Sequence, residues 1–159
     1  MPIRLPVRSL VRIGVLLALG GCGGKTALED KGVDELERML RSDVPAEQIR
    51  AANGLGRHGA EARSAVPALA AALPSNPTLV RASAAQALAQ IGPDARAAVP
   101  ALLEALRDPE WTVRRQAAVA LGAIGPDART AVTALEKLRQ DPDHLVRKAA
   151  QEALQKIRR

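Results

Sequence analysis

Apolar residues recur along this chain every 33 residues from Val33 onward. Four columns are in register: Val33, Val66, Val99 and Val132; Leu36, Leu69, Leu102 and Leu135; Leu55, Leu88, Leu121 and Leu154; and Gly59, Gly92 and Gly125. A fixed period of this length is the signature of a repeat architecture, in which each unit is one supersecondary structure. We therefore divide the chain into units of residues 33–64, 65–97, 98–130 and 131–159.

Within each unit the apolar spacing is typical of helices. In the third unit one stripe is formed by Val99, Leu102, Leu103 and Leu106, and a second by Val113, Ala117, Leu121 and Ile124. Asp108-Pro109 between the stripes predicts a turn. Gly125-Pro126-Asp127 after the second stripe predicts another tight turn, in which Gly ends one helix and Pro opens the next. Pro67 and Pro100 are expected either to start the first helix of their units or to kink it.

Such hairpins predict an all-α superhelix, a solenoid of about four helical hairpins. A single hairpin cannot cover its apolar faces, so the units must stack side by side. The composition agrees, because the chain has no Phe, no Tyr and one Trp. A core of Ala, Leu, Val and Ile without large aromatic side chains suits closely packed helices.

The third unit carries the most specific runs: Val99-Pro100-Ala101-Leu102-Leu103, Asp108-Pro109, Val113-Arg114-Arg115-Gln116-Ala117-Ala118 and Ala120-Leu121-Gly122-Ala123-Ile124-Gly125. These runs resemble the short HEAT-like repeat, which is related to repeats in phycobilisome lyases. The ankyrin Thr-Pro-Leu-His signature and the tetratricopeptide aromatic pattern are absent. The resemblance spans about residues 33–159. It is weakest in the first unit, where His58 occupies an isoleucine column and is expected to be a structural histidine.

The resemblance also implies a role for several charged residues. Asp108 and Arg114 are six residues apart, as are Asp141 and Arg147, and Arg81 holds the place of Arg114 in its unit. HEAT families use such residues as a ladder, in which the arginine of one unit reaches aspartates along the stack. A partly shielded ion pair of this kind fixes the register between units. We favour this structural role over an anion-binding one.

The second helix of each unit supplies a candidate partner surface, because HEAT arrays line their concave side with these helices. If Val113, Ala117 and Leu121 face inward, then positions 115, 119 and 122 face outward. The aligned outward positions are Ala82, Arg115 and Lys148; Gln86, Val119 and Glu152; and Ala89, Gly122 and Gln155. We expect partner contacts at Arg115, Lys148, Val119, Gln86 and Glu152. A plainly solvated helix face is the alternative.

Trp111 is a separate candidate for partner binding. It follows the turn inside the third unit, where burial is not expected, and Trp is enriched at binding hot spots. The alternative is a tryptophan that lies across a neighbouring turn.

The N-terminus has the order of a secretory signal: a basic stretch to Arg12, a short apolar core over residues 13–19, then small residues. Seven apolar residues are too few for a membrane-spanning helix, which needs about 20. Leu19-Gly20-Gly21-Cys22 resembles the lipobox of bacterial lipoproteins, although Gly at the second of these positions is less usual than Ala or Ser.

The lipobox resemblance implies cleavage before Cys22 and lipidation of its thiol and its new amine. We therefore expect a signal over residues 1–21, a lipidated linker over 22–32 and anchoring in a bacterial cell envelope. No Asp follows Cys22, which favours the outer membrane where two membranes are present.

The charge of the chain does not point to nucleic acid. The formal net charge is +6, but residues 1–21 hold three arginines and no acid. Their removal leaves 20 basic and 17 acidic side chains, a balance of +3 that is ordinary for a protein surface.

The sequence contains no recognisable set of catalytic residues. The chain has two His, one Cys and no Tyr, and it lacks metal-binding and nucleophile motifs. We predict no catalytic residues, no metal and no cofactor, and therefore no enzyme.

The function predicted from the sequence is a membrane-anchored scaffold for an unidentified protein partner. Self-association through the last repeat is also expected, because no polar cap is obvious there. The alternatives are an accessory, lyase-like or chaperone subunit of an enzyme complex and, if the N-terminus were retained, a nucleic-acid-binding HEAT protein.

Overall fold

The computed structural model describes residues 31–74 and 76–159. The elements are α1 (Val33–Leu40), α2 (Pro45–His58), η1 (Gly59–Ala65), α3 (Val66–Ala71), α4 (Thr78–Ile91), η2 (Gly92–Ala98), α5 (Val99–Ala105), α6 (Trp111–Ile124), η3 (Gly125–Ala131), α7 (Val132–Leu138) and α8 (His144–Ile157), where η marks a 3-10 helix. All regular secondary structure in the described part of the chain is therefore helical.

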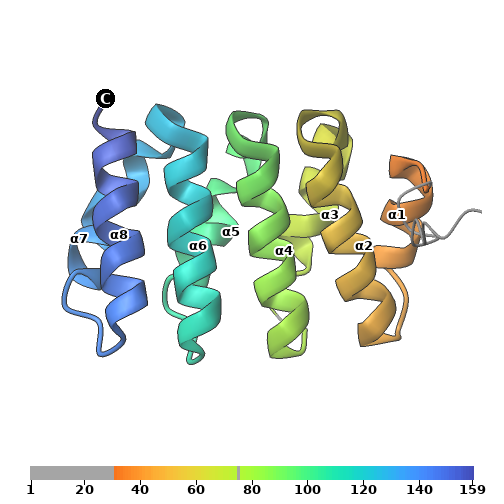
Figure 1. Ribbon diagram of the computed structural model, residues 1–159, viewed down its shortest axis with the longest axis horizontal. Helices are drawn as coiled ribbons and strands as arrows, with labels where there is room; N and C mark the ends of the chain where they lie inside the picture. The colour runs from red at the N-terminus through yellow and green to blue at the C-terminus, as the bar shows by residue number, and fades with distance from the viewer. Residues whose placement is uncertain (1–30, 75) are drawn as a thin grey trace, which may run out of the picture.

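The helices form two layers (Figure 1). The long helices α2, α4, α6 and α8 lie side by side in the front layer, and the shorter α1, α3, α5 and α7 lie behind them. We call the front four the second helices and the other four the first helices. Each second helix packs along the second helix of the next unit, whereas successive first helices touch at few points. The predicted all-α solenoid of helical hairpins is confirmed.

The columns seen in the sequence form the core. Leu36, Leu69, Leu102 and Leu135 on the first helices are fully buried, as are Leu55, Leu88 and Leu121 on the second helices. Alanines fill the space between these leucines, and the buried residues form one cluster that runs along the described units. Small side chains let neighbouring helices approach closely, so the core is continuous from unit to unit.

The connections between units differ from the tight turns that the sequence predicts. Each is a seven-residue 3-10 helix, and Pro93 and Pro126 open these segments rather than the next α-helix. The glycines that start them, Gly59, Gly92 and Gly125, have φ of 54°, 73° and 77° with ψ between −130° and −139°. This combination suits glycine because it has no Cβ.

Pro67 and Pro100 lie in the first turn of α3 and α5. A proline is tolerated there because the N–H that it lacks would have no partner within the helix. Of the two alternatives that the sequence left open, the structure shows helix starts and not kinks.

The outward side of α8 is polar. Gln151 and Gln155 are exposed on α8, at the positions where α6 has the buried Ala118 and Gly122 that face the next unit. Polar outer faces are typical of terminal repeats, which must remain soluble. The expectation that the last unit lacks a polar cap is therefore wrong. The polar outward side of α8 gives no support to the expected self-association through the last repeat.

Candidate binding surface

Arginines of the second helices bind aspartates of the following unit. Arg114 on α6 donates from Nε and Nη2 to the two carboxylate oxygens of Asp141, at 2.8 and 3.0 Å. Arg81 on α4 makes the same pair of hydrogen bonds with Asp108, both at 2.7 Å. These bidentate ion pairs link α4 to the loop before α6, and they link α6 to the loop before α8. They are partly shielded from water, with the Arg114 and Asp141 side chains 16% and 7% exposed.

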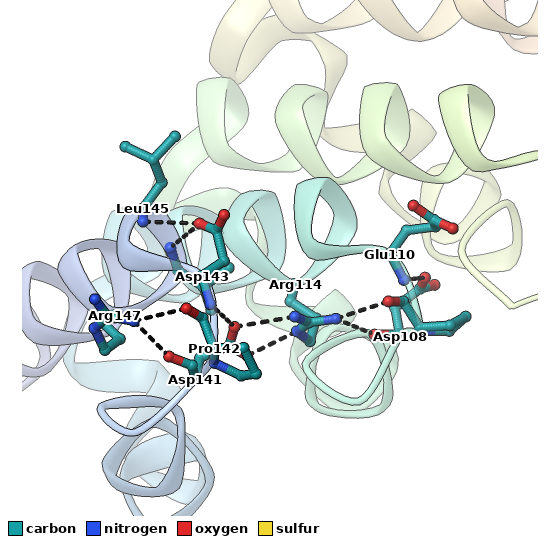
Figure 2. A network of polar contacts seen from close by, with 10 residues as sticks. Asp108, Glu110, Arg114, Asp141, Pro142, Asp143, Leu145 and Arg147 are labelled. Carbon is teal, nitrogen blue, oxygen red and sulfur yellow. Dashed lines mark hydrogen bonds and ion pairs between the residues drawn. The ribbon is translucent and has the colours of Figure 1, made fainter.

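The same arginines also hold the loops within their own units (Figure 2). Nη1 of Arg114 donates to the backbone carbonyls of Asp108 and Pro109, both at 2.9 Å. Arg147 on α8 repeats this pattern with Asp141 and Pro142, at 2.7 and 2.8 Å. An arginine and the aspartate six residues before it in the sequence therefore contact each other through the aspartate's backbone carbonyl. The carboxylate of each ladder aspartate instead binds the arginine 27 residues before it. Arg147 is exposed and has no carboxylate partner among the described residues.

The ladder also sets the protonation of its aspartates. Partial burial by itself raises the pKa of the Asp141 carboxyl. Hydrogen bonds from Arg114 and from the Asp143 backbone N–H, with the positive charges of Arg114 and Arg147, outweigh that effect and lower the pKa. The pKa of Asp108 is lowered by the same balance, with Arg81 and the Glu110 backbone N–H as the hydrogen-bond donors. Both aspartates therefore favour the charged form that the ladder uses.

The residues predicted to contact a partner lie on the second helices. Gln86, Lys148 and Glu152 are exposed, whereas Arg115 and Val119 are half-buried. Lys148 lies 3.9 Å from Glu152 along α8, a loose ion pair between well-exposed side chains. These residues come from α4, α6 and α8, which lie side by side (Figure 1).

Gly122 does not lie on this surface, and its predicted outward position is wrong. It is buried, and a Cβ added to it would lie 2.8 Å from the Cα atom of Ala153 on α8. The two second helices approach so closely at this point that only glycine fits. Ala89, at the same place on α4, is half-buried, and Gln155 on α8 is exposed. The column of Ala89, Gly122 and Gln155 therefore faces the next unit on α4 and α6, and it is exposed on α8, where no further helix of the described residues packs.

Three large apolar residues are exposed in the described part of the chain, and all lie at one edge. Trp111 is the first residue of α6 and is 39% exposed, Leu79 is the second residue of α4 and is 68% exposed, and Val44 directly precedes α2 and is 50% exposed. Sequence reasoning identified Trp111 and missed the other two. Val44 and Leu79 occupy the repeat positions directly before and directly after that of Trp111, so the repeat alignment could have identified them.

The remaining polar side chains that could carry chemistry are dispersed. Within residues 31–74 and 76–159, no three His, Cys, Asp or Glu side chains are grouped as a metal site would need. His58 is half-buried, and its Nε2 lies 3.0 Å from the carbonyl oxygen of Lys31, which accepts a hydrogen bond. His144 is the exposed first residue of α8.

Shallow grooves separate successive first helices. The groove between α3 and α5 has a volume of about 370 Å³ and is lined mainly by Ala70, Leu73, Ala101 and Ala105. A similar groove of about 370 Å³ lies between α5 and α7.

The predicted lipid anchor cannot be placed from this structure. Cys22 and the predicted signal of residues 1–21 lie outside the described residues. No helix in the described part is long and apolar enough to cross a membrane.

Comparison with protein families decides the identity of the repeat. The family model for HEAT repeats matches residues 66–155, which is more than half of the chain. The chain belongs to the HEAT repeat family. The resemblance seen in the sequence is thus confirmed for the second, third and fourth HEAT units. The degenerate first unit lies outside the matched residues.

Solved structures agree with this assignment. Two engineered proteins share 32% and 31% identity with the chain, both with a TM-score of 0.67 and 79% of the chain covered. The HEAT chain spans 62% of the length of the first and 37% of the second. The complex of CpcE and CpcF of phycocyanin lyase from Nostoc sp. PCC7120 is similar at 24% identity and a TM-score of 0.54, over 80% of this chain and 65% of that one. This last likeness concerns the fold alone. No curated protein matches the chain.

Proposed function

We propose that this HEAT protein is a lipid-anchored scaffold of the bacterial cell envelope that binds a protein partner on its second-helix face. We define this face by nine exposed or half-buried residues and the half-buried Ala82: Arg50 and Arg57 on α2, Leu79, Ala82 and Gln86 on α4, Arg115 and Val119 on α6, and Lys148, Glu152 and Lys156 on α8. The observation that carries the proposal is the continuity of this face across four helices that pack in register.

The packing explains why the face suits binding rather than catalysis. Helices α4 and α6 each use one side for the core and two sides for neighbouring second helices, and α2 and α8 each have one such neighbour, so the remaining side of each is available along the whole stack. The Arg81–Asp108 and Arg114–Asp141 pairs hold successive units in register. A rigid surface loses little conformational freedom when a partner binds, and repeat solenoids use such extended surfaces for recognition.

The anchoring part of the proposal rests on Leu19-Gly20-Gly21-Cys22 and the basic and apolar segments before it. Acyl chains on Cys22 would hold the solenoid at a membrane, because each buried CH₂ contributes about 0.8 kcal/mol. A Cys22→Ala variant is expected to move from the membrane fraction to the soluble fraction of cells. If the variant stays in the same membrane fraction, the anchor is wrong.

The scaffold role is tested by photo-crosslinking in cells. A photoreactive amino acid at position 82, 115 or 148 is expected to yield a discrete adduct with a protein. The same amino acid at position 96, an exposed site on η2, serves as the matched control. Adducts to lipid alone, or the same adducts from position 96, would contradict a scaffold that uses this face.

An accessory subunit of an enzyme complex is the second candidate. The observation in its favour is the similarity in fold to the solved complex of CpcE and CpcF of phycocyanin lyase. At 24% identity this similarity concerns the fold alone. Recovery of an enzyme as the crosslinked partner, with its activity lowered when this chain is deleted, would favour this candidate over a passive scaffold.

A further inference from the structure

Charge is divided unequally between the two helical layers. The four second helices carry eight Lys or Arg and two Glu, a net charge of +6. The four first helices carry two Lys or Arg and five Asp or Glu, a net charge of −3. The 3-10 connectors are neutral, with one acid and one base each. The excess of positive charge therefore lies on the second helices, because Glu37, Glu104 and Glu136 of the first helices pair with arginines just beyond the helix ends, Arg41, Arg107 and Arg139.

Much of the positive charge on the second helices is free to meet a partner. Arg81 and Arg114 are committed to the ladder, and their aspartates neutralise them. Lys148 has only its loose pair with Glu152. Five further basic residues of the second helices have no ion-pair partner among residues 31–74 and 76–159. Arg147 of these five is held by backbone carbonyls of its own loop, and the other four are Arg50, Arg57, Arg115 and Lys156. These cations lie toward the two ends of the face, on α2 at one end and on α6 and α8 at the other.

The middle of the face is uncharged and partly apolar. Helix α4 contributes Leu79 and Gln86 and has no charged residue other than the ladder arginine. Val119 is half-buried on α6, and Trp111 is exposed at the start of the same helix. A partner that fits this arrangement has acidic groups toward both ends and apolar side chains between them.

We propose that the second-helix face binds an acidic, partly apolar segment of a partner protein; this inference rests on the proposed scaffold function and names the chemistry of the partner. Axes of packed helices are about 10 Å apart, so a segment that crosses from α2 to α8 spans about 30 Å. A helix of about 20 residues has this length. Opposite charges across the contact would set the orientation of the segment and raise its association rate.

The observations favour a protein segment over a phosphate backbone. Nucleic acids are bound by dense basic patches, since each neutralised phosphate releases a counterion. Here the cations are spread over three helices, and Glu152 and several amide and apolar side chains lie between them. Amides and apolar side chains match a peptide better than they match a sugar-phosphate chain or a lipid headgroup layer.

Direct binding by the full chain in detergent tests the inference. The probe is a fluorescent helical peptide of about 20 residues, the length needed to cross the face, with Glu and Leu at helical spacing. Its control is the same peptide with Lys in place of Glu. The acidic peptide is expected to bind at low salt, the basic one to bind much less, and binding is expected to weaken as salt screens the charges.

Two matched variants locate the site. R115E/K148E reverses two cations of the face, and R96E/R129E reverses two exposed cations of the 3-10 connectors with the same change in net charge. The first variant is expected to weaken binding of the acidic peptide about ten-fold, which is about 1.4 kcal/mol. The second is expected to leave binding within about two-fold of the unmodified chain, or about 0.4 kcal/mol. Unchanged helical circular dichroism and melting temperature exclude misfolding.

The inference is overturned if both variants weaken binding equally. It is also overturned if duplex DNA or vesicles with anionic lipid bind the face more tightly than the acidic peptide. If crosslinking from positions 115 and 148 captures a protein but the acidic peptide does not bind, the scaffold function stands and the acidic partner does not. If crosslinking captures no protein, the proposed function itself fails.

Discussion

Replacing Asp141 by alanine should destabilise this HEAT protein more than any other single change to a charged side chain of the Arg114–Asp141 ladder step. The Asp141 carboxylate accepts two hydrogen bonds from Arg114 and one from the Asp143 backbone N–H, at 2.8, 3.0 and 2.9 Å. The substitution removes all three. It also leaves Nε and Nη2 of Arg114 without a carboxylate in a partly buried site.

The expected cost is about 3 kcal/mol of unfolding free energy. Hydrogen bonds to charged groups contribute about 1.5–3 kcal/mol each, and breaking one partner of a buried ion pair costs about 3–5 kcal/mol. Arg114 and Asp141 retain some access to water, with side chains 16% and 7% exposed, so the lower part of these ranges applies. For a domain of this size the change corresponds to a melting temperature lower by about 10 °C.

Urea unfolding at pH 7, followed by circular dichroism, measures the change. The matched control is Asp127→Ala, because Asp127 is exposed on η3 and makes no ion pair with the described residues. The control should cost less than about 0.5 kcal/mol. An Asp141→Ala variant within that same margin of the unmodified chain would refute the claim that the ladder stabilises the contact between units.

The same variant has a signature in pH. The pKa of Asp141 is lowered on folding, so its contribution is fully present above the unfolded pKa of about 3.9 and is lost as pH falls through the lower folded value. The stability difference between the unmodified chain and Asp141→Ala should thus be constant near neutral pH and shrink below about pH 4. A difference that persists undiminished in acid would indicate a loss of packing and not of charge.

Three further changes separate the other forces in the fold, each measured by chemical unfolding. Leu121 is fully buried, so Leu121→Ala should cost about 2–5 kcal/mol, and a cost below about 1 kcal/mol would contradict its place in the core. Gly122→Ala forces a Cβ against the Cα atom of Ala153 and should cost about 1–3 kcal/mol; a neutral effect would mean that α6 and α8 can separate without penalty. Gly125→Ala meets no atom within 4 Å but must adopt a φ of 77°, so a cost of about 1–3 kcal/mol is expected from backbone strain alone, and stabilisation would contradict that conformation.

Half of the candidate surface could be predicted from the sequence, because the repeat aligns equivalent positions of successive helices. Arg115 and Lys148 share a column in the sequence, and both lie on the second helices as expected. The excess of positive charge on the second helices was not predicted. It appears only when charges are sorted by layer, because acidic residues elsewhere in the chain lower the overall net charge.

The ladder shows a similar limit. The six-residue spacing of Asp108 and Arg114 is visible in the sequence, yet it does not say which oxygen atoms each guanidinium meets. In the structure the side-chain carboxylates pair with the arginine of the preceding unit, and the near-neighbour contact uses backbone carbonyls. Distances between units depend on how one hairpin is rotated against the next, which no local spacing specifies.

The sequence by itself determined the helical repeat, its period and its core, because a leucine every 33 residues on helices of fixed pitch can be buried only by stacking. Tertiary structure alone decided which small residues lie between units and which polar ones face water. Gly122 and Gln155 occupy the same repeat position, yet one is buried against Ala153 and the other is exposed on α8. The physical reason is that burial at this position depends on whether another helix packs against it, and the repeat pattern is the same in both cases.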